Sequence, residues 1–245
     1  MKTTLLIDGD QFLFTACIAV EKEIRWDDQN HVLYSNASEA RNNLDGMLGR
    51  IFDRFDTKAH ILTFTKGVNF RLGVDPTYKN HRAGARKPLC YAQLREDIAG
   101  DYKCLSIDTL EADDVMGILA TQPASKNAKH IIVSQDKDMR TIPGTLWDGK
   151  DLLTISKAEA DYFHMYQTLI GDTADGYKGC PGLGPVKAAK LLDTAEAKWP
   201  VVLAAYLKAG LTEADALQQA QLARILRHSD WDPNTRTPIM WEPQR

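Results

Sequence analysis

The chain has 245 residues, of which 44% are hydrophobic and 26% are charged, and its net charge at pH 7 is -3. These values are typical of a soluble globular protein with one large domain, or one domain and a smaller appendage, and no segment approaches the ~20 apolar residues of a membrane span. The slightly acidic charge excludes binding of nucleic acid through overall charge, so such a partner needs a local basic patch.

The first part of the chain alternates between short apolar runs and helical patterns. Strands are predicted at 3–8, 59–64 and 129–134, with a weaker one at 102–107 and edge strands within 145–155; helices are predicted at about 36–57, 89–99 and 110–121. Because strands that alternate with helices form parallel sheets covered on both faces, residues 1–156 are predicted to form an α/β core.

After residue 156 the strand patterns stop and helical patterns follow. Ser156 and Glu159 have the spacing of a capping box, and further helices are predicted at about 185–193, 197–209 and 212–227. Thr212 suits the N-cap of the last one. We therefore expect a helical region over 157–245 that ends in an extended tail rich in proline.

The N-terminus and the cysteines favour a cytoplasmic protein. The apolar run in "MKTTLLIDGDQFLF" meets Asp8 too early for a signal peptide. The four cysteines show no C-x-x-C pairing, so we expect free thiols in a reducing compartment.

Acidic residues gather where the carboxyl ends of the parallel strands should meet. They are Asp8 with Asp10, then Glu111, Asp113 and Asp114, then Asp136 and Asp138, and finally Asp172 and Asp175. Ligands bind at this edge of open α/β sheets. Any single group of these acids also suits a helix N-terminus or a loop. If the chain is still extended after the strand at 129–134, Asp136 and Asp138 point to one face.

Repulsion makes the whole set harder to explain without bound cations. Two carboxylates ~4 Å apart repel by about 4 kcal/mol at an effective dielectric constant near 20. Hard divalent cations such as Mg²⁺ prefer an all-oxygen site, and no His or Cys spacing indicates zinc. We therefore expect one or two Mg²⁺ or Mn²⁺ ions, of the kind that catalyse phosphoryl displacement.

A basic segment follows the second predicted strand. The stretch "KGVNFRLGVDPTYKNHRAGARKPLCY" contains Lys, Arg and His residues, interleaved aromatic residues and a single acid, Asp75. Cations for phosphates and rings for stacking suit single-stranded nucleic acid, although a solvated loop is the simpler alternative.

A glycine-rich turn lies in the helical region, in "KGCPGLGPVKAAKLL". Gly182 and Gly184 form a turn with exposed backbone N–H groups, and Pro185 suits the first position of a helix. This pattern resembles a helix-hairpin-helix, which binds the DNA backbone without reading bases, although an ordinary turn between helices is the alternative.

Taken together, these motifs resemble the 5′-nuclease (flap endonuclease) superfamily, and in particular the gene-6-type 5′→3′ exonucleases of short-tailed phages. The resemblance covers nearly the whole chain. The matching stretches are "IDGD" at 7–10, "NFR…DPTYKNHR" at 69–82, "KP" with "Y" at 87–91, "EADDVMG" at 111–117, "DKD…TIP" at 136–143, "GDTADGYKG" at 171–179 and "AQLARILR" at 220–227.

The resemblance implies a PIN-like nuclease core over 1–156 with an arch or clamp at about 66–98, and a DNA-binding region with a helix-hairpin-helix (H3TH) at about 171–195. It implies Mg²⁺-dependent cleavage from the 5′ ends of duplex DNA, with flap cutting and RNase H-like action on RNA–DNA hybrids, during phage replication or recombination. It implies a monomer without a membrane partner, and it leaves room for K⁺ at the helix-hairpin-helix.

The resemblance also implies roles for individual residues. Asp8, Glu111, Asp113 and Asp114 would hold one ion, and Asp136, Asp138, Asp172 and Asp175 the other. The catalytic residues would include Asp8, Asp113 and Asp136, with Lys79 and Arg82 reaching the scissile phosphate and Tyr78 stacking on the terminal base. The DNA-binding residues would be Arg71, Tyr78, Lys79, Arg82, Arg86, Lys87, Gly182, Gly184, Lys187 and Lys190.

One position departs from the family. Where relatives commonly carry a further acid, this chain has Lys66, or Thr65 if the alignment shifts by one residue. An ammonium group there would weaken the first metal site, or partly replace a metal.

Two other classes remain open. One is a non-catalytic protein that binds DNA ends or flaps, in which Lys66 marks a degraded metal site. The other is a haloacid-dehalogenase-like phosphatase, because "LLIDGD" resembles the D-x-D of that family.

Overall fold

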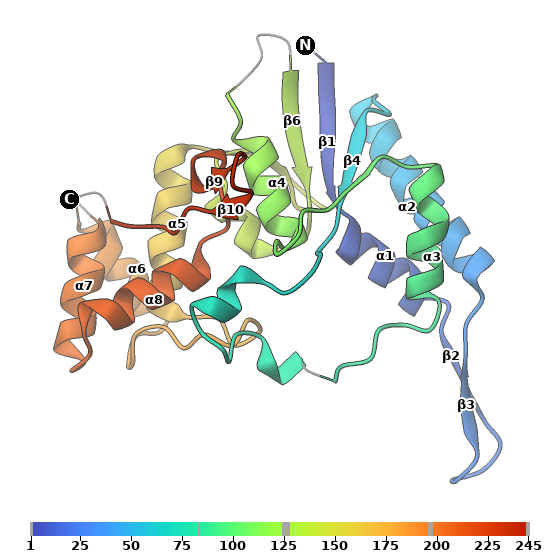
Figure 1. Ribbon diagram of the computed structural model, residues 1–245, viewed down its shortest axis with the longest axis horizontal. Coiled ribbons are helices and arrows are strands. Elements are labelled where there is room, and N and C mark those ends of the chain that lie inside the picture. The colour runs from blue at the N-terminus through green and yellow to red at the C-terminus, as the bar shows by residue number, and fades with distance from the viewer. Residues whose placement is uncertain (1, 83, 124–127, 196–197, 244–245) are drawn as a thin grey trace.

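The computed structural model describes residues 2–243 apart from 83, 124–127 and 196–197. Its centre is a six-stranded sheet in the order β5-β4-β1-β6-β7-β8, of which β4, β1 and β6 are labelled side by side in Figure 1. The strands are β1 (Lys2–Asp8), β4 (His60–Thr63), β5 (Cys104–Leu105), β6 (Ala128–Val133), β7 (Gly144–Trp147) and β8 (Leu152–Ile155). Neighbouring strands are parallel, except that β7 and β8 are antiparallel. The predicted α/β core with a mostly parallel sheet is confirmed.

Helices cover both faces of the sheet because successive side chains of a buried strand point in opposite directions. On one face, Leu5 and Ile7 of β1 pack with α1 (Gly9–Ile18), α2 (Ala37–Phe55) and α3 (Tyr91–Asp97). On the other face, Leu6 packs with Met116 of α4 (Ala112–Ala120). This doubly covered sheet fixes the ends of β1, β4 and β6 next to one another.

The helical region has a hydrophobic core of its own, formed by α5 (Lys157–Ile170), α6 (Pro185–Asp193), α7 (Lys198–Lys208) and α8 (Glu213–Ala223). The predicted capping box of Ser156 and Glu159 is present, and so is the cap at Thr212. These helices lie on the side of the molecule opposite α2 and α3 (Figure 1).

Two predictions about this region are wrong. The last helix ends at Ala223 rather than near 227, because the chain becomes extended at Arg224 and then buries Arg224 and Arg227 in ion pairs with Asp230 and Asp161. Strands also continue beyond residue 156, since β9 (Trp231–Asp232) and β10 (Thr237–Pro238) form a short antiparallel ribbon.

In the first part of the chain, a helix and a hairpin lie outside the predicted elements. The first is α1, whose buried positions nevertheless follow helical spacing. The second is a hairpin of β2 (Lys22–Arg25) and β3 (His31–Tyr34), which extends away from the body of the molecule (Figure 1). Its residues are exposed, so no core pattern marked it in the sequence.

Short 3₁₀ helices complete the fold, and the four cysteines are free thiols, as predicted. The 3₁₀ helices are η1 (Phe70–Gly73), η2 (Asn80–Arg82), η3 (Ile98–Gly100), η4 (Lys137–Thr141) and η5 (His228–Asp230). Among the described residues, no helix combines the length and the apolar character that a membrane crossing requires.

Candidate active site

Three carboxylates meet where β1, β6 and the start of α4 come together. Asp8 is the last residue of β1 and accepts a hydrogen bond from the backbone N–H of Gln11 at 3.0 Å, so it also caps α1. Asp136 follows the parallel neighbour β6, and Asp113 lies in the first turn of α4. The parallel pairing thus brings together residues that are more than a hundred positions apart in the chain.

Among the described residues, these three acids repel one another without forming an ion pair, although the charge of Lys79 partly opposes the rise in the pKa of Asp113. Burial, together with the charges of Asp10 and Asp136, raises the pKa of Asp8 to about 6. Burial and the charges of Asp8 and Asp136 raise the pKa of Asp113 well above its ordinary value. The ion pairs within the described parts of the chain include none to Asp8, Asp113 or Asp136. A bound cation would therefore be stabilised here.

A second group of acids lies beside the first. Burial and the neighbouring Asp136 raise the pKa of Asp138 to about 7, and the charges of Asp172 and Asp175 add to this shift. Burial would raise the pKa of Asp172, but Lys137, whose Nζ lies 2.7 Å from Asp172 Oδ2, and the backbone N–H groups of Ala174 and Asp175 together lower it. The second group is thus partly neutralised by a lysine of the protein.

The condition under which Asp136 and Asp138 would point to one face, an extended chain after β6, is not met. Residues 137–141 form the 3₁₀ helix η4, and Asp136 is its N-cap, accepting a hydrogen bond from the Asp138 backbone N–H at 2.8 Å. The relative positions of the two carboxylates are therefore set by a helical turn and not by the alternation of side chains along a strand.

The basic segment folds back onto the acids. Lys79 Nζ lies 2.6 Å from Glu111 and 3.2 Å from Asp175, and Arg82 lies 3.3 Å from Asp175. Burial would lower the pKa of Lys79, but the charges of Glu111 and Asp175 outweigh it and raise that pKa. Lys79 and Arg82 therefore lie at the acidic cluster, although their predicted roles in catalysis remain predictions.

Tyr78 differs from its prediction as a stacking platform for a base. Its side chain is buried against Tyr177 and Leu222, and its hydroxyl lies 3.1 Å from carboxylate oxygens of both Glu111 and Asp175. A buried ring cannot stack on a terminal base, so Tyr78 positions acids in this structure.

Arg71 and Asp114 correct two further predictions and explain how the crowded acids of α4 coexist. Arg71 is 2% exposed, and its Nη1 and Nη2 atoms each lie 2.8 Å from an oxygen of Asp114, which is fully buried. An arginine enclosed in this way is not available to DNA. Arg71 binds both oxygens of Asp114, so Asp114 is a structural partner of Arg71 and its oxygens are not free for a metal ion.

Lys66 also lies apart from the acidic cluster. Its Nζ is 3.0 Å from Asp108 Oδ1, and both side chains are exposed. Its neighbour Thr65 donates its backbone N–H to Asp10 and accepts a hydrogen bond from the Ala112 N–H. The structure therefore supports neither of the two expected effects of Lys66 on a metal site.

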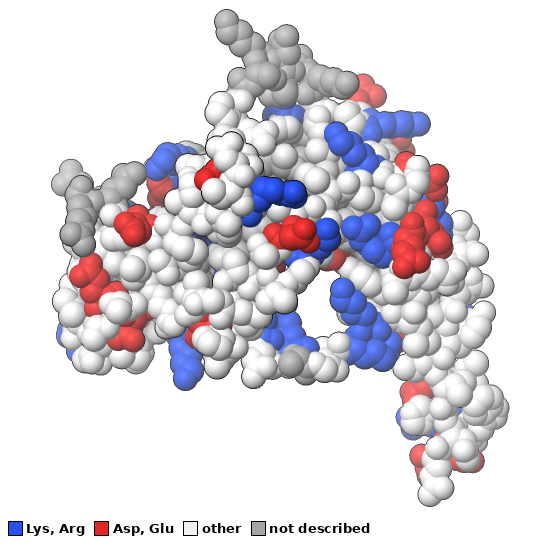
Figure 2. Space-filling model, in the orientation of Figure 1, with Lys and Arg blue, Asp and Glu red and all other residues white. Residues whose placement is uncertain are grey.

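The remaining predicted DNA contacts lie on the surface. Arg86 forms a bidentate ion pair with Glu21, and Lys87 Nζ lies 4.3 Å from the centre of the Tyr91 ring. In Figure 2 an opening separates the segment after β4 from the body of the molecule, and basic side chains border it.

The glycine turn precedes α6 as the sequence predicted. Gly182 has a φ of 76°, Gly184 is the N-cap of α6 and Pro185 is its first residue. Lys187 and Lys190 are exposed on this helix. Whether these groups contact DNA remains a prediction.

Three residues at the site have no such role predicted from the sequence. Lys137 pairs with Asp172, Gln167 donates to Asp138 through Nε2, and Tyr91 donates its hydroxyl to Asp10 at 2.7 Å. Gln167 is 1% exposed, and a polar residue on the apolar face of α5 was a signal that could have been used. The other two contacts depend on tertiary structure.

The donor chemistry of the cluster fits hard divalent cations, since all the uncompensated ligands are carboxylate oxygens. Within the described residues, no three His, Cys, Asp or Glu side chains are already arranged tightly enough to hold one ion. Lys79 and Lys137 lie against Glu111, Asp175 and Asp172, and their ammonium groups neutralise part of the charge that cations would neutralise.

The sequence is similar to known nucleases. Residues 3–161 match the family described as the 5′-3′ exonuclease, N-terminal resolvase-like domain. The chain is 31% identical to an exodeoxyribonuclease of Enterobacteria phage T3 and 30% identical to an exonuclease of Escherichia phage T7, and each match covers 99% of this chain and 94% of the relative.

The fold is similar to solved nuclease structures. It resembles the flap endonuclease of bacteriophage T5 in a complex with DNA and metal ions, with a TM-score of 0.63 and 13% identity over 91% of this chain and 89% of the other. At that identity the comparison speaks for the fold alone, and it agrees with the predicted PIN-like architecture.

Proposed function

This chain belongs to the 5′-3′ exonuclease family, and from that premise we propose that it hydrolyses duplex DNA from 5′ ends with the help of two Mg²⁺ ions. It is a nuclease, a hydrolase of phosphodiester bonds. The proposal includes cleavage of 5′ flaps and of RNA–DNA hybrids, replacement of Mg²⁺ by Mn²⁺, and action as a monomer in the host cytoplasm during phage replication or recombination.

The observation that carries this proposal is the uncompensated cluster of Asp8, Asp113 and Asp136. Asp136 raises the pKa of both Asp8 and Asp113, Asp8 also raises that of Asp113, and within the described residues no lysine or arginine forms an ion pair with the three acids. Carboxylates with shifted pKa values that gather in one place are typical of a functional site. Divalent ions satisfy both the electrostatics and the chemistry of phosphodiester hydrolysis.

We assign Asp8, Glu111 and Asp113 to one ion and Asp136, Asp138, Asp172 and Asp175 to the other. Bound ions would make water a stronger nucleophile and offset charge on the leaving oxygen. Lys79 and Arg82 lie beside Glu111 and Asp175, where they add positive charge at the place that a scissile phosphate would occupy. Asp10 is held by Tyr91 and Thr65, and it orders the surroundings of Asp8.

DNA binding is assigned to two regions of different chemistry. The basic border of the opening in Figure 2 attracts the strand near the acids. The turn before α6 presents backbone N–H groups and the helix N-terminus, with Lys187 and Lys190 nearby, which suits phosphates or a K⁺ ion that bridges to them. We propose that the core of 1–156 cuts and that the region 157–245 holds the duplex.

The test uses 5′- and 3′-labelled duplex, flap and RNA–DNA hybrid substrates, incubated with and without Mg²⁺, with the products sized on a gel. We expect short products released from 5′ ends only when Mg²⁺ or Mn²⁺ is present. Tight binding of flap DNA without cleavage would instead identify a DNA-end binder. Hydrolysis of a small phosphate ester without cleavage of DNA would identify a phosphatase.

A further inference from the structure

Arg71 uses every hydrogen-bond donor of its guanidinium inside the protein. Nε donates to the Leu222 carbonyl at 3.1 Å, Nη1 to Glu111 and Asp114 at 3.1 and 2.8 Å, and Nη2 to Asp114 and the Arg224 carbonyl at 2.8 and 2.6 Å. A guanidinium has five N–H groups in a fixed fork. No donor is left for DNA or water, so the orientation of Arg71 is determined completely.

Arg71 and its partners come from three segments that are far apart in the chain. Arg71 itself belongs to η1, at the base of the basic segment, while Glu111 and Asp114 begin α4, and the two carbonyls follow from the end of α8. Asp114 strengthens the same junction by accepting the backbone N–H of Leu226 at 3.1 Å. The guanidinium therefore joins the nuclease core, the basic segment and the helical region at one point.

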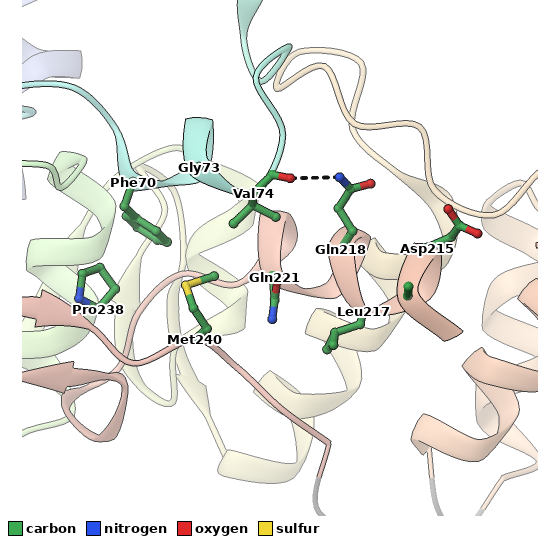
Figure 3. A pocket seen from close by; sticks show the side chains of 10 residues that line it. Phe70, Gly73, Val74, Asp215, Leu217, Gln218, Gln221, Pro238 and Met240 are labelled. Atoms are coloured by element: carbon green, nitrogen blue, oxygen red, sulfur yellow. Dashed lines mark hydrogen bonds between the residues drawn. The ribbon is translucent and has the colours of Figure 1, made fainter. Parts of the chain in front are cut away.

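A second contact fastens the same segment to α8. Gln218 Nε2 donates to the Val74 carbonyl at 2.9 Å, beside a cavity of about 650 Å³ between η1, α8 and the C-terminal tail (Figure 3). The Phe70 ring lines this cavity, and its centre is 4.6 Å from the Arg71 guanidinium carbon. The segment that carries Arg71 is thus also fastened to α8 on the C-terminal side of that residue.

Three side chains of the basic segment donate hydrogen bonds to the Glu111 carboxylate. Its Oε2 accepts from Arg71 and from the Tyr78 hydroxyl, each at 3.1 Å, and its Oε1 accepts from Lys79 at 2.6 Å. Of these three donors, Tyr78 and Lys79 also contact Asp175. Within the described chain, the hydrogen bonds of the Arg71 side chain go only to residues at the start of α4 and the end of α8. Its contact with Glu111 therefore does not depend on the second group of acids.

We propose that Arg71 is a positioning residue that fixes the Glu111 carboxylate and so sets the affinity of the first metal ion, rather than a DNA contact or a simple counter-ion of Asp114. The inference rests on the proposed function, because it concerns the metal that this function requires. Partners that orient metal ligands typically change metal affinity by 10–100-fold when they are removed.

The test is a double-mutant cycle on Mn²⁺ affinity, measured by electron paramagnetic resonance on the full chain without DNA. Arg71→Lys keeps the positive charge but cannot reproduce the planar fork. We expect it to weaken Mn²⁺ binding by about tenfold or more when Glu111 is present, and by less than about twofold in the Glu111→Gln background. An equal loss in both backgrounds, or no loss with Glu111 present, overturns the inference.

A matched control separates positioning from general damage to the fold. Arg224 is also buried and pairs with Asp230, but its side chain contacts no acid of the cluster. Arg224→Lys should lower stability toward urea and leave Mn²⁺ affinity unchanged. If Arg71→Lys does not fold, the neutral pair Arg71→Gln/Asp114→Asn replaces it in the same cycle, with the same outcomes.

The wild-type protein distinguishes failure of this inference from failure of the proposed function. If the wild type neither binds Mn²⁺ nor cleaves DNA with it, the proposed function fails. If the wild type does both and the Arg71 variant binds Mn²⁺ equally well, only the role of Arg71 is wrong.

Discussion

Asp113 and Asp114 are adjacent in the chain, yet their carboxylates have opposite electrostatic surroundings. One step along an α-helix turns a side chain by about 100°, so Asp113 faces Asp8 and Asp136 while Asp114 faces Arg71. Asp114 is therefore neutralised within the protein, whereas Asp113 carries charge that burial and its neighbours oppose. At the scale of single residues, this difference decides which acid is suited to a metal.

Asp113→Asn should lower the cleavage rate by at least about a hundredfold, because a lost metal ligand removes several kcal/mol of charge stabilisation. It should also raise the free energy of unfolding in EDTA at pH 7. Folding raises the pKa of Asp113, so above pH 4 the ionised carboxylate of the wild type lowers the free energy of unfolding. The neutral amide of the Asp113→Asn variant does not have this cost. Cleavage assays and urea denaturation measure the two effects.

The control for this change is Asp108→Asn, which affects an exposed ion pair with Lys66 outside the cluster. Its stability should remain within about 0.5 kcal/mol of the wild type and its cleavage rate should be unchanged. Normal cleavage by Asp113→Asn would show that the role of Asp113 is misassigned.

His164 should make the protein sensitive to acid. Burial, aided by the charge of Arg224, lowers its pKa to about 3 from 6.5. Between these values the unfolded chain binds the proton and the folded one does not, so stability is full above pH 6.5 and falls as the pH drops. Between pH 6.5 and pH 5, the free energy of unfolding should fall by roughly 2 kcal/mol because of His164.

The measurement is urea denaturation of the wild type and of His164→Gln at both pH values. Other titrating groups are common to the two proteins, so they cancel in the difference. His164 Nε2 lies 2.8 Å from the Ala220 carbonyl, and the amide of glutamine can donate to the same atom. An equal loss of stability in both proteins would contradict the assigned protonation of His164.

At the scale of elements, the helices of the helical region differ in how they begin. Ser156 with Glu159 and Thr212 with Asp215 form reciprocal capping boxes, while α6 begins at Pro185 without a side-chain cap. Its first N–H groups therefore lack a capping side chain, and Gly182 and Gly184 are exposed nearby. The start of α6 thus differs physically from those of α5 and α8, which is consistent with a phosphate-binding end.

Lys187→Gln should weaken binding of duplex DNA regardless of its sequence, because the proposed contact is to phosphate. The slope of log affinity against log salt concentration should fall in magnitude by about one. Fluorescence anisotropy of labelled duplex over a series of salt concentrations gives both quantities. Lys208→Gln, an exposed lysine at the end of α7, is the control and should change neither one. An unchanged salt slope for Lys187→Gln would exclude the contact.

At the scale of the whole molecule, the nuclease core and the helical region are joined by close packing as well as by Arg71. A Cβ atom at Gly117 in α4 would lie 2.3 Å from the Leu226 carbonyl oxygen and 3.2 Å from Ile225 Cγ2. The backbone that follows α8 therefore rests directly on α4. Since α4 also carries Glu111 and Asp113 at its start, this packing links the helical region to the acids.

Gly117→Ala should lower the free energy of unfolding by about 1–3 kcal/mol, because the backbone of the neighbouring segment must shift. Gly49→Ala is the matched control, since Gly49 lies within α2 and, in the described chain outside its own stretch of helix, no atom lies within 4 Å of the added carbon. That change should stabilise the protein by roughly 0.5–1 kcal/mol. Urea denaturation compares the two, and a neutral Gly117→Ala would show that the segments are loosely packed.

Local patterns in the sequence were sufficient for most of the fold. Apolar runs predicted all six strands of the central sheet, and capping residues predicted the starts of α5 and α8, because each depends on residues within a few positions. The hairpin β2–β3 was missed because its strands bury no face, and α1 was missed although its buried positions have helical spacing.

For the site, the sequence by itself determined that acids would gather at the carboxyl edge of a parallel sheet and that a basic segment would lie beside them. Only the tertiary structure decided that Arg71 neutralises Asp114, that Tyr78 is buried and that Lys66 lies elsewhere. These pairings join residues tens of positions apart, such as Arg71 and Asp114. The physical reason is that a charge is compensated by whatever packing brings within a few ångströms of it, and no local pattern records that distance.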